Sequence, residues 1–146
     1  MGFFRSLDIS ASGLTAQRLR MDIISENLAN ISTTRTAAGG PYRRRFTTFE
    51  QAGTPAFSSA LQNALDNGYA GAGVRVAAIQ EDPSEFKRVY DPTHPDAGDD
   101  GFVLMPNVDV EREMVDMISA SRAYEANVTA MNALKAMAVK ALNIGK

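Results

Sequence analysis

Apolar residues recur at heptad spacing along the first 31 residues of the chain. The positions seven residues apart are occupied by Leu7, Leu14, Met21 and Leu28, and Ile24 and Ile31 fill intermediate positions. Ser10 and Gln17 stand at the corresponding positions of the first half, which weakens the pattern there. The spacing predicts a helix over 7–31 with a coiled-coil-like seam, and the threonines and glycines that follow, up to Pro41, end it.

A second helical pattern begins after Pro106 and Asn107. Asp109, Glu111 and Glu113 place negative charge in its first turns, where the helix dipole favours it. Its larger side chains follow a 4-3-4-3-4-3 spacing through Val110, Met114, Met117, Ser121, Tyr124, Val128 and Met131, and Leu134, Ala138 and Ala141 continue this stripe after a shift of register. The pattern predicts a long helix that reaches almost to the last residue.

Small residues form a separate stripe on the same predicted helix. They are Ala123, Ala126, Ala130 and Ala133, at 3-4-3 spacing. An ordinary surface helix has one apolar stripe and a well-charged opposite face. From Ala126 onward, however, the charged residues are only Lys135, Lys140 and Lys146. Because this helix is apolar or small over most of its circumference, we expect it to be buried on more than one side.

The middle of the chain, residues 37–106, has a different pattern, without long helical repeats. Aromatic, threonine and β-branched residues cluster in short runs that are typical of strands. The expected strands are 42–49, 74–79 and 86–90. We expect the third of these to return beside the second, after a turn at 82–84 that contains Pro83.

The rest of the middle consists of loops and one ambiguous segment. A loop rich in Pro, Asp and Gly over 91–101 leads to a short apolar segment, 102–105. Residues 56–66 fit either a short helix or a tethering loop, and 68–73 form a glycine-rich stretch that we expect to be flexible.

Together these patterns predict an α+β protein. Long N- and C-terminal helices, within residues 1–36 and 107–146, form a coiled-coil-like pair, and residues 37–106 form a small, irregular β-rich module between them. The module is too small to cover both helices, and their pairing leaves the alanine stripe exposed. Exposed apolar surfaces of that extent mark interaction sites. We therefore expect the heptad residues of the first helix and both stripes of the second to form an assembly interface.

The composition narrows the classes of function. The chain has 146 residues, and its 15 Lys and Arg against 17 Asp and Glu give a formal net charge of -2. This near balance argues against a nucleic-acid binder and against a protein that attaches to a membrane by a basic face. The absence of cysteine excludes disulfides, thiol nucleophiles and thiolate metal sites. No apolar run is long enough to predict a membrane-spanning helix.

The acidic loop around His94 is the best candidate for a metal site. Asp91, Asp96, Asp99 and Asp100 supply oxygen donors of the kind that Mg²⁺ or Ca²⁺ prefers. The spacing of an EF-hand is absent, and no second His or Glu cluster completes a catalytic set. The density of Pro and Gly is typical of a turn-rich surface loop. We therefore predict no catalytic residue, no metal site and no cofactor.

A run of three arginines, Arg43, Arg44 and Arg45, lies between Tyr42 and Phe46. Such a cluster could bind phosphates while the aromatic rings stack on bases. However, alternation along a strand would send the arginines to both faces, and the net charge of the chain is unfavourable. We expect instead salt bridges to acidic residues of neighbouring subunits, and no nucleic-acid partner.

Both ends of the chain carry motifs that resemble those of one family. Residues 9–30 resemble the N-terminal signature of bacterial flagellar rod and hook proteins, and residues 107–127 resemble the matching C-terminal signature. The motif residues are Ser12, Gly13, Asn27 and Asn30 at one end and Arg122, Tyr124 and Asn127 at the other. The segments 33–44, 90–96 and 105–108 are similar to the proximal rod proteins within this family.

The resemblance implies a non-enzymatic structural subunit of the flagellar basal-body rod. Such proteins leave the cytoplasm through the flagellar type III export apparatus, without a cleaved signal peptide, and assemble with other rod proteins and copies of themselves. The resulting helical shaft crosses the periplasm and transmits motor torque, and its inner layer of paired terminal helices encloses the export channel. The residues alone leave one alternative, an adaptor that binds a partner helix through its striped ends without polymerising.

Overall fold

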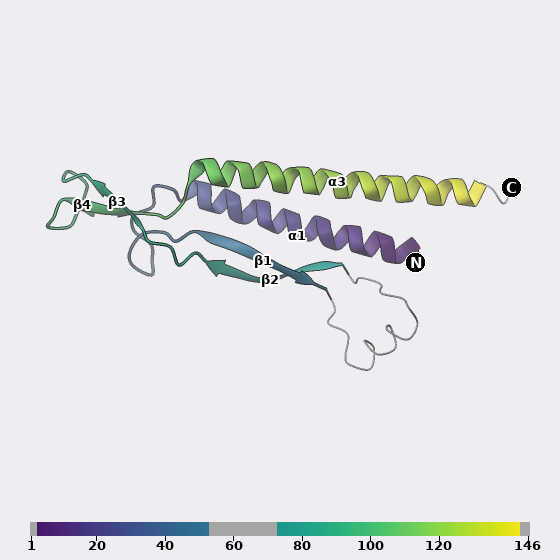
Figure 1. Ribbon diagram of the computed structural model, residues 1–146, viewed down its shortest axis with the longest axis horizontal. Helices are drawn as coiled ribbons and strands as arrows, with labels where there is room; N and C mark the ends of the chain where they lie inside the picture. Colours follow the sequence, from purple (N-terminus) through teal and green to yellow (C-terminus); the bar gives the residue numbers. More distant parts are fainter. Residues whose placement is uncertain (1–2, 53–72, 144–146) are drawn as a thin grey trace, which may run out of the picture. The chain divides into compact units, whose positions relative to one another are not determined.

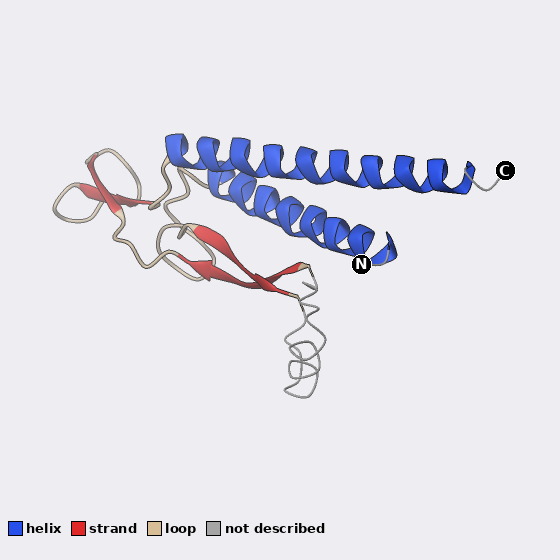
Figure 2. Cartoon of the chain, turned by 45° about the vertical axis from the view of Figure 1, so that its right-hand side comes forward, coloured by secondary structure: helices blue, strands red, loops and turns tan. Residues whose placement is uncertain are grey.

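The computed structural model describes residues 3–52 and 73–143. The elements follow in the order α1 (Phe3–Ala29), β1 (Arg45–Gln51), β2 (Val74–Glu81), β3 (Lys87–Tyr90), β4 (Phe102–Met105) and α3 (Val110–Asn143) (Figure 1). The predicted α+β class, with long terminal helices and a small β module between them, is confirmed (Figure 2). The ambiguous segment 56–66 lies outside the described residues, as does the glycine-rich stretch that follows it, up to residue 72.

Helix α1 begins one turn earlier than the heptad predicted and ends at Ala29. Asn30 closes its last turn, because the backbone N–H of Asn30 donates to the carbonyl oxygens of Glu26 at 3.1 Å and Asn27 at 3.2 Å. The Asn30 side-chain Nδ2 donates to the Glu26 carbonyl as well, at 2.9 Å. The terminal carbonyls of a helix lack partners within the helix, so this asparagine satisfies groups that would otherwise depend on water.

Helix α3 begins where the sequence predicts, directly after Asp109. Asp109 is its N-cap residue, since Asp109 Oδ1 accepts a hydrogen bond from the backbone N–H of Glu111 at 3.1 Å. The Asp109 carbonyl accepts the backbone N–H of Glu113 at 2.9 Å, which is the first hydrogen bond of the helical ladder. Within the described residues, no helix is long and apolar enough to cross a membrane.

The four strands of the described part form two antiparallel two-stranded sheets, β1–β2 and β3–β4. The expectation that the strand at 86–90 returns beside the second strand is therefore wrong: β3 pairs with β4, with Lys87 opposite Met105 and Tyr90 opposite Phe102. The turn at 82–84 does not close a hairpin, because the carbonyls of Asp82 and Ser84 are bound elsewhere. Arg43 Nη1 donates to them at 2.9 and 3.2 Å.

The loop rich in Pro, Asp and Gly closes the β3–β4 hairpin. The backbone N–H of Asp91 donates to the Gly101 carbonyl at 3.0 Å, and Gly101 has a φ of 71°, which a glycine adopts without strain. Asp91 Oδ1 accepts the backbone N–H of Thr93 at 3.0 Å and its hydroxyl at 2.7 Å. The acidic loop thus uses a carboxylate to form its own turn.

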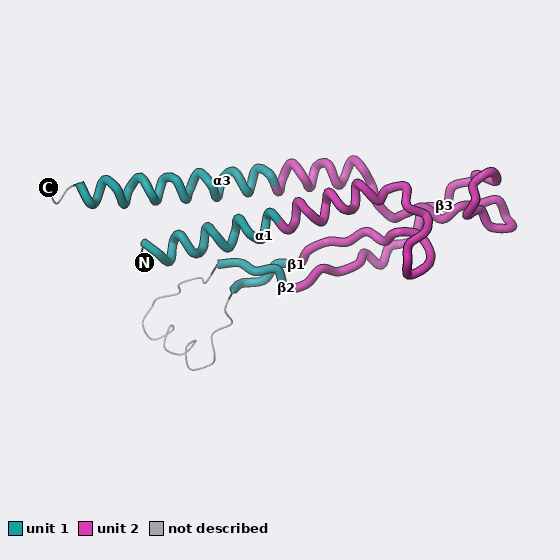
Figure 3. The backbone as a smooth tube through the Cα atoms, turned by 180° about the vertical axis from the view of Figure 1, so that it is seen from behind, with its two compact units in different colours: residues 1–18, 49–77, 121–146 teal, residues 19–48, 78–120 magenta. Residues whose placement is uncertain are grey.

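The chain divides into two compact units, and each contains a part of both helices (Figure 3). Unit 1 comprises Met1–Arg18, Phe49–Ala77 and Ser121–Lys146, and unit 2 comprises Leu19–Thr48 and Ala78–Ala120. Among the described residues, most of the buried ones belong to unit 2, namely Ile23, Ile24, Asn27, Tyr42, Arg44, Val103, Pro106, Val108, Glu113 and Ala120. Ser10 and Ala16 are the buried residues of unit 1 within the described part.

Candidate assembly interface

A buried polar cluster joins the two helices to the segment before β1 in unit 2. We call it the polar junction; its members are Asn27 of α1, Tyr42, Arg44, and Glu113 of α3. Asn27 and Glu113 are 0% exposed and Arg44 is 8% exposed. Arg44 Nε donates to Glu113 Oε1 at 2.6 Å, and Asn27 Nδ2 donates to Glu113 Oε2 at 3.0 Å. Each oxygen of this carboxylate therefore has a donor, as a buried charge requires.

Asn27 binds the backbone as a neighbouring strand would. Its Nδ2 donates to the Arg45 carbonyl at 2.8 Å, and its Oδ1 accepts the Arg45 backbone N–H at 3.0 Å. The Tyr42 hydroxyl donates to the same Oδ1 at 3.0 Å. The asparagine side chain thus fixes the start of β1 against α1, which gives this motif residue a physical role.

The Arg44 guanidinium lies among three carboxylates. Besides Glu113, it forms ion pairs with two aspartates: Arg44 Nη1 lies 3.5 Å from Asp82 Oδ2, and Arg44 Nη2 lies 3.6 Å from Asp116 Oδ2. Asp116 also accepts a hydrogen bond from Arg20 Nη2 of α1 at 2.9 Å. Removing an arginine from water costs several kcal/mol, which only such surrounding carboxylates and hydrogen bonds offset.

The other two arginines of the run also bind within the chain. Arg43 donates to two backbone carbonyls of the 82–84 segment, and its guanidinium lies 4.4 Å from the centre of the Phe86 ring. Arg45 faces Glu26 at 3.5 Å and Glu81 at 3.9 Å. The sequence did not predict these intrachain contacts, and the expected salt bridges to neighbouring subunits stay a prediction.

Two pKa values in unit 2 are shifted by these surroundings. Burial raises the pKa of the Tyr42 hydroxyl above its ordinary value of 10.0, and the Glu26 carboxylate adds to the effect. Hydrogen bonds from the backbone and hydroxyl of Ser84 lower the pKa of Asp82 below its ordinary 3.8, and Arg44 lowers it further. The raised pKa favours the neutral Tyr42 hydroxyl, which donates a hydrogen bond to Asn27. The lowered pKa favours the ionised Asp82, which pairs with Arg44.

Unit 1 brings together motif residues from the two ends of the chain. Gly13 of α1 lies so near to Asn127 of α3 that a Cβ atom at position 13 would be 3.1 Å from Asn127 Oδ1. Ser12 Oγ accepts the backbone N–H of Val74 at 3.1 Å and donates to the Ile9 carbonyl at 2.7 Å. Gly73 has a φ of 92°, and any Cβ there would collide with Ser12. The N-terminal motif therefore anchors both α3 and the start of β2.

The predicted interface residues differ widely in exposure. Ile24 is buried inside the chain. The half-buried ones are Leu7, Leu14, Met21, Leu28 and Ile31, followed by Met117, Ala123, Tyr124, Val128, Met131 and Leu134. The exposed ones are Val110, Met114, Ala126, Ala130 and Ala133. Of the remaining motif residues, Asn30 is half-buried and Arg122 is exposed. Much of the predicted stripe thus stays open to further contacts.

An apolar cleft lies between the start of α1 and the end of α3 in unit 1. Its volume is about 630 Å³, and it is lined by Phe3, Phe4, Leu134, Met137, Ala138, Ala141 and Leu142. Phe4 is 78% exposed and Leu142 is 77% exposed. Single exposed apolar residues are common in soluble proteins, but a continuous apolar cleft marks a surface that another molecule covers.

The acidic loop does not gather its side chains into a ligand set. The Asp96 carboxylate accepts the Thr34 hydroxyl at 2.8 Å, and His94 Nδ1 accepts the backbone N–H of Asp96 at 3.1 Å. Across residues 3–52 and 73–143, no three His, Asp or Glu side chains form a group that could hold a metal ion. Asp91 and His94 thus bind within the loop, whereas Asp96 binds the loop to Thr34.

Sequence reasoning missed the burial of Glu113. The sequence marks this residue only as an acid in the first turns of α3, where the helix dipole favours negative charge. Glu113, Ala120 and Asn127 are seven residues apart. Glu113 and Ala120 are buried, Glu113 binds Asn27 of α1, and Asn127 lies beside Gly13 of α1. The available signal was the spacing: Glu113 lies one heptad before the small residue Ala120 and two heptads before Asn127.

We expect Glu113→Ala to lower the free energy of unfolding by about 3 kcal/mol, because Arg44 then stays buried without its main partner. The double variant Arg44→Met/Glu113→Met should lose less free energy of unfolding than Arg44→Met or Glu113→Met alone. Glu111→Ala, an exposed carboxylate in the same turn, is the matched control and should change little. Urea unfolding of these variants measures this, and equal losses for Glu113→Ala and Glu111→Ala would contradict a buried ion pair.

The raised pKa of Tyr42 predicts an alkaline limit to stability. The folded state binds the phenolic proton of Tyr42 more tightly than the unfolded state does. The contribution of this proton to the free energy of unfolding is therefore complete below pH 10.0 and is lost as the pH rises through the raised folded pKa. Tyr42→Phe cannot ionise and should show a smaller alkaline loss, although it costs about 1 kcal/mol at neutral pH through the lost hydrogen bond. Urea unfolding at neutral and alkaline pH tests this; identical alkaline losses in both proteins would refute it.

Comparison with known proteins agrees with the two terminal motifs. The family model described as "Flagella basal body rod protein" matches residues 7–35. The model described as "Flagellar basal body rod FlgEFG protein C-terminal" matches residues 99–144. The two matches cover the N-terminal and the C-terminal motif at the proper ends of one chain.

Full-length relatives narrow the family. The chain is 54% identical to the flagellar basal-body rod protein FlgC of Bacillus subtilis, over 100% of both chains. It is 53% identical to FlgC of Borreliella burgdorferi, over 99% of this chain and 98% of the relative, and 38% identical to FlgC of Salmonella typhimurium, over 100% of both. The chain therefore belongs to the FlgC family of bacterial flagellar basal-body rod proteins, which are structural components of that rod and not enzymes.

Proposed function

We propose that the chain is a subunit of the proximal rod, and that it joins copies of itself and other rod proteins through its terminal helices. The observation that carries this proposal is the apolar cleft between Phe3, Phe4 and the last turns of α3. The exposed alanines at 126, 130 and 133 add a surface on which a neighbouring helix can pack closely. Both features belong to the helix ends of unit 1, which has few buried residues of its own.

The proposed mechanism of assembly is heterologous packing. A contact between two different surfaces of identical or related chains leaves one surface free on each side, so the assembly grows as a helix. In the shaft that we propose, the paired helix ends form the inner layer around the export channel, and the middle module lies outside. The polar junction then carries motor torque from the module to both helices, because Arg44 and Glu113 bind them together with short, charged hydrogen bonds.

The proposal includes export of the chain in a largely unfolded state by the flagellar type III apparatus, into the periplasm. The sequence contains no cysteine, so no disulfide forms that would hinder passage through a narrow channel. The helix ends of unit 1 then gain most of their buried surface only on assembly, which separates transport from polymerisation.

We expect Ala130→Glu to abolish motility and rod formation, because a neighbouring helix would have to bury an unpaired carboxylate. Asn132→Glu, which adds the same charge in the same turn but outside the alanine stripe, is the matched control and should retain motility. Both are measured by swimming in soft agar and by electron microscopy of isolated basal bodies. Normal rods in the Ala130→Glu strain would show that this stripe has no role in assembly.

We further expect the helices of the dilute monomer to be ordered only where the polar junction binds them. Amide hydrogen exchange should be slow in residues 19–29 and 110–120 and fast in 121–143, because within the described residues no side chain of 121–143 is fully buried. Incorporation into rods should then protect 121–143. Slow exchange of that segment in the monomer would mean that its folding does not depend on neighbours.

A further inference from the structure

One face of the β3–β4 hairpin carries four side chains that the proposed helix contacts do not use. We call it the hairpin patch; it consists of Arg88, Tyr90, Phe102 and Leu104. The strand register places Arg88 opposite Leu104 and Tyr90 opposite Phe102, so all four share one face. Tyr90 is 66% exposed and Phe102 is 41% exposed, whereas Val103, which points to the other face, is buried.

The hairpin patch has the chemistry of a protein-binding surface. The Tyr90 and Phe102 rings meet edge to face, with centroids 5.3 Å apart, and the Arg88 guanidinium lies 5.3 Å from the centre of the Phe102 ring. In the described part of the chain, Arg88 has no carboxylate partner. Tyr, Phe and Arg are the residue types enriched where proteins bind one another, and aromatic residues and arginine supply most of the binding energy there.

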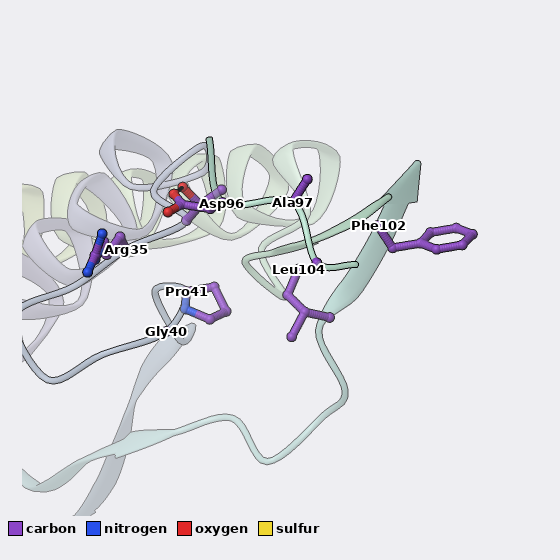
Figure 4. A pocket seen from close by; sticks show the side chains of 9 residues that line it. Arg35, Gly40, Pro41, Asp96, Ala97, Phe102 and Leu104 are labelled. Atoms are coloured by element: carbon purple, nitrogen blue, oxygen red, sulfur yellow. Dashed lines mark hydrogen bonds between the residues drawn. The ribbon is translucent and has the colours of Figure 1, made fainter. Parts of the chain in front are cut away.

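A cleft beside the patch extends this surface. It has a volume of about 380 Å³, and Phe102 and Leu104 line it together with Gly40, Pro41 and other residues of the two adjacent loops. In Figure 4, the Leu104 side chain lies on the side of Pro41, and the Phe102 ring points away from it. A bound segment therefore meets Pro41 and Leu104 in the cleft, together with the polar residues Thr34, Arg35 and Asp96, and an aromatic pair beyond it.

A second unused surface of the same unit lies on α3. We call it the outer stripe of α3; it consists of Val110, Glu111, Met114, Val115 and Ile118. Val115 is 67% exposed and Ile118 is 53% exposed, although both are β-branched apolar residues in the first turns of a helix. Glu111 lies among them and, within the described residues, forms no ion pair. The stripe is thus apolar with a single unpaired carboxylate.

We propose that the hairpin patch of one copy docks on the outer stripe of α3 of a second copy, with Arg88 paired to Glu111 across the contact. This inference rests on the proposed function, since it names one contact of the assembly. The two surfaces complement each other: the patch carries an unpaired cation on aromatic rings, and the stripe carries an unpaired carboxylate among apolar side chains. Each copy keeps one free patch and one free stripe, so the contact propagates.

A charge exchange tests the pairing. Arg88→Glu and Glu111→Arg should each weaken association of the full-length chain with itself about tenfold, because like charges then meet in the contact. The double variant Arg88→Glu/Glu111→Arg should restore association and motility. Arg112→Glu, in the same turn of α3 but outside the outer stripe, is the matched control. Sedimentation of the purified chains and basal bodies from the corresponding strains measure these effects.

The absence of cysteine allows a direct check of which surfaces meet. A copy with Leu104→Cys is mixed under oxidising conditions with a copy that carries Met114→Cys or Ile118→Cys. A disulfide between the two different copies supports the contact, whereas the Leu104→Cys copy alone should form no linked dimer. Absence of any link at both positions, under conditions in which the chains associate, overturns the proposal.

The possible results separate this inference from the proposed function. If the single charge variants fail to enter the rod and the double variant fails as well, the patch binds a different rod protein and the inference is wrong, while the proposed function stands. Single variants that assemble like the unmodified chain also refute the inference. Failure of the proposed function itself is seen in a separate experiment, as normal rods in the Ala130→Glu strain.

Discussion

The rest of unit 2 depends on the burial of one arginine. Arg44 precedes β1 and is 8% exposed, so its charge needs carboxylates around it. Glu113 and Asp116 come from α3, and Asp82 comes from the end of β2. The desolvation of a single guanidinium therefore fixes the position of three segments that are far apart in the sequence. Apolar contacts add stability, but they tolerate several residue types, whereas a buried guanidinium requires carboxylates or other acceptors within hydrogen-bond distance.

The two helices could be predicted from the sequence because their signals are local: heptad spacing, an N-cap at Asp109 and an asparagine at the end of α1. The strand pairing could not be predicted in the same way. The carbonyls of Asp82 and Ser84 accept hydrogen bonds from Arg43 and Asn107, which are distant from the expected turn in the sequence. The burial of Glu113 could not be predicted for the same reason, because its partners Arg44 and Asn27 come from distant parts of the chain.

The large heptad residues of α1 in unit 1 are less buried than two small residues of the same helix. In unit 1, the buried residues of α1 are Ser10 and Ala16, and Gly13 is nearest to α3. Small residues allow the backbones to approach, and the large residues at 7, 14 and 21 are only half-buried as a result. The motif of small residues thus sets the distance between the helices, and the large residues remain available for contacts outside the chain.

This arrangement explains how a chain with a net charge of -2 can serve assembly. Several of its charged side chains form ion pairs within the chain: Arg44 and Arg45 pair with acids of unit 2, and Arg20 pairs with Asp116. The charges near the free apolar surfaces are few, and each has a distinct consequence. Arg88 and Glu111 lack partners within the described part of the chain, so they can select which surfaces meet. Internal pairing fixes the positions of the segments of unit 2, and in the contact that we propose the unpaired Arg88 and Glu111 determine which surfaces meet.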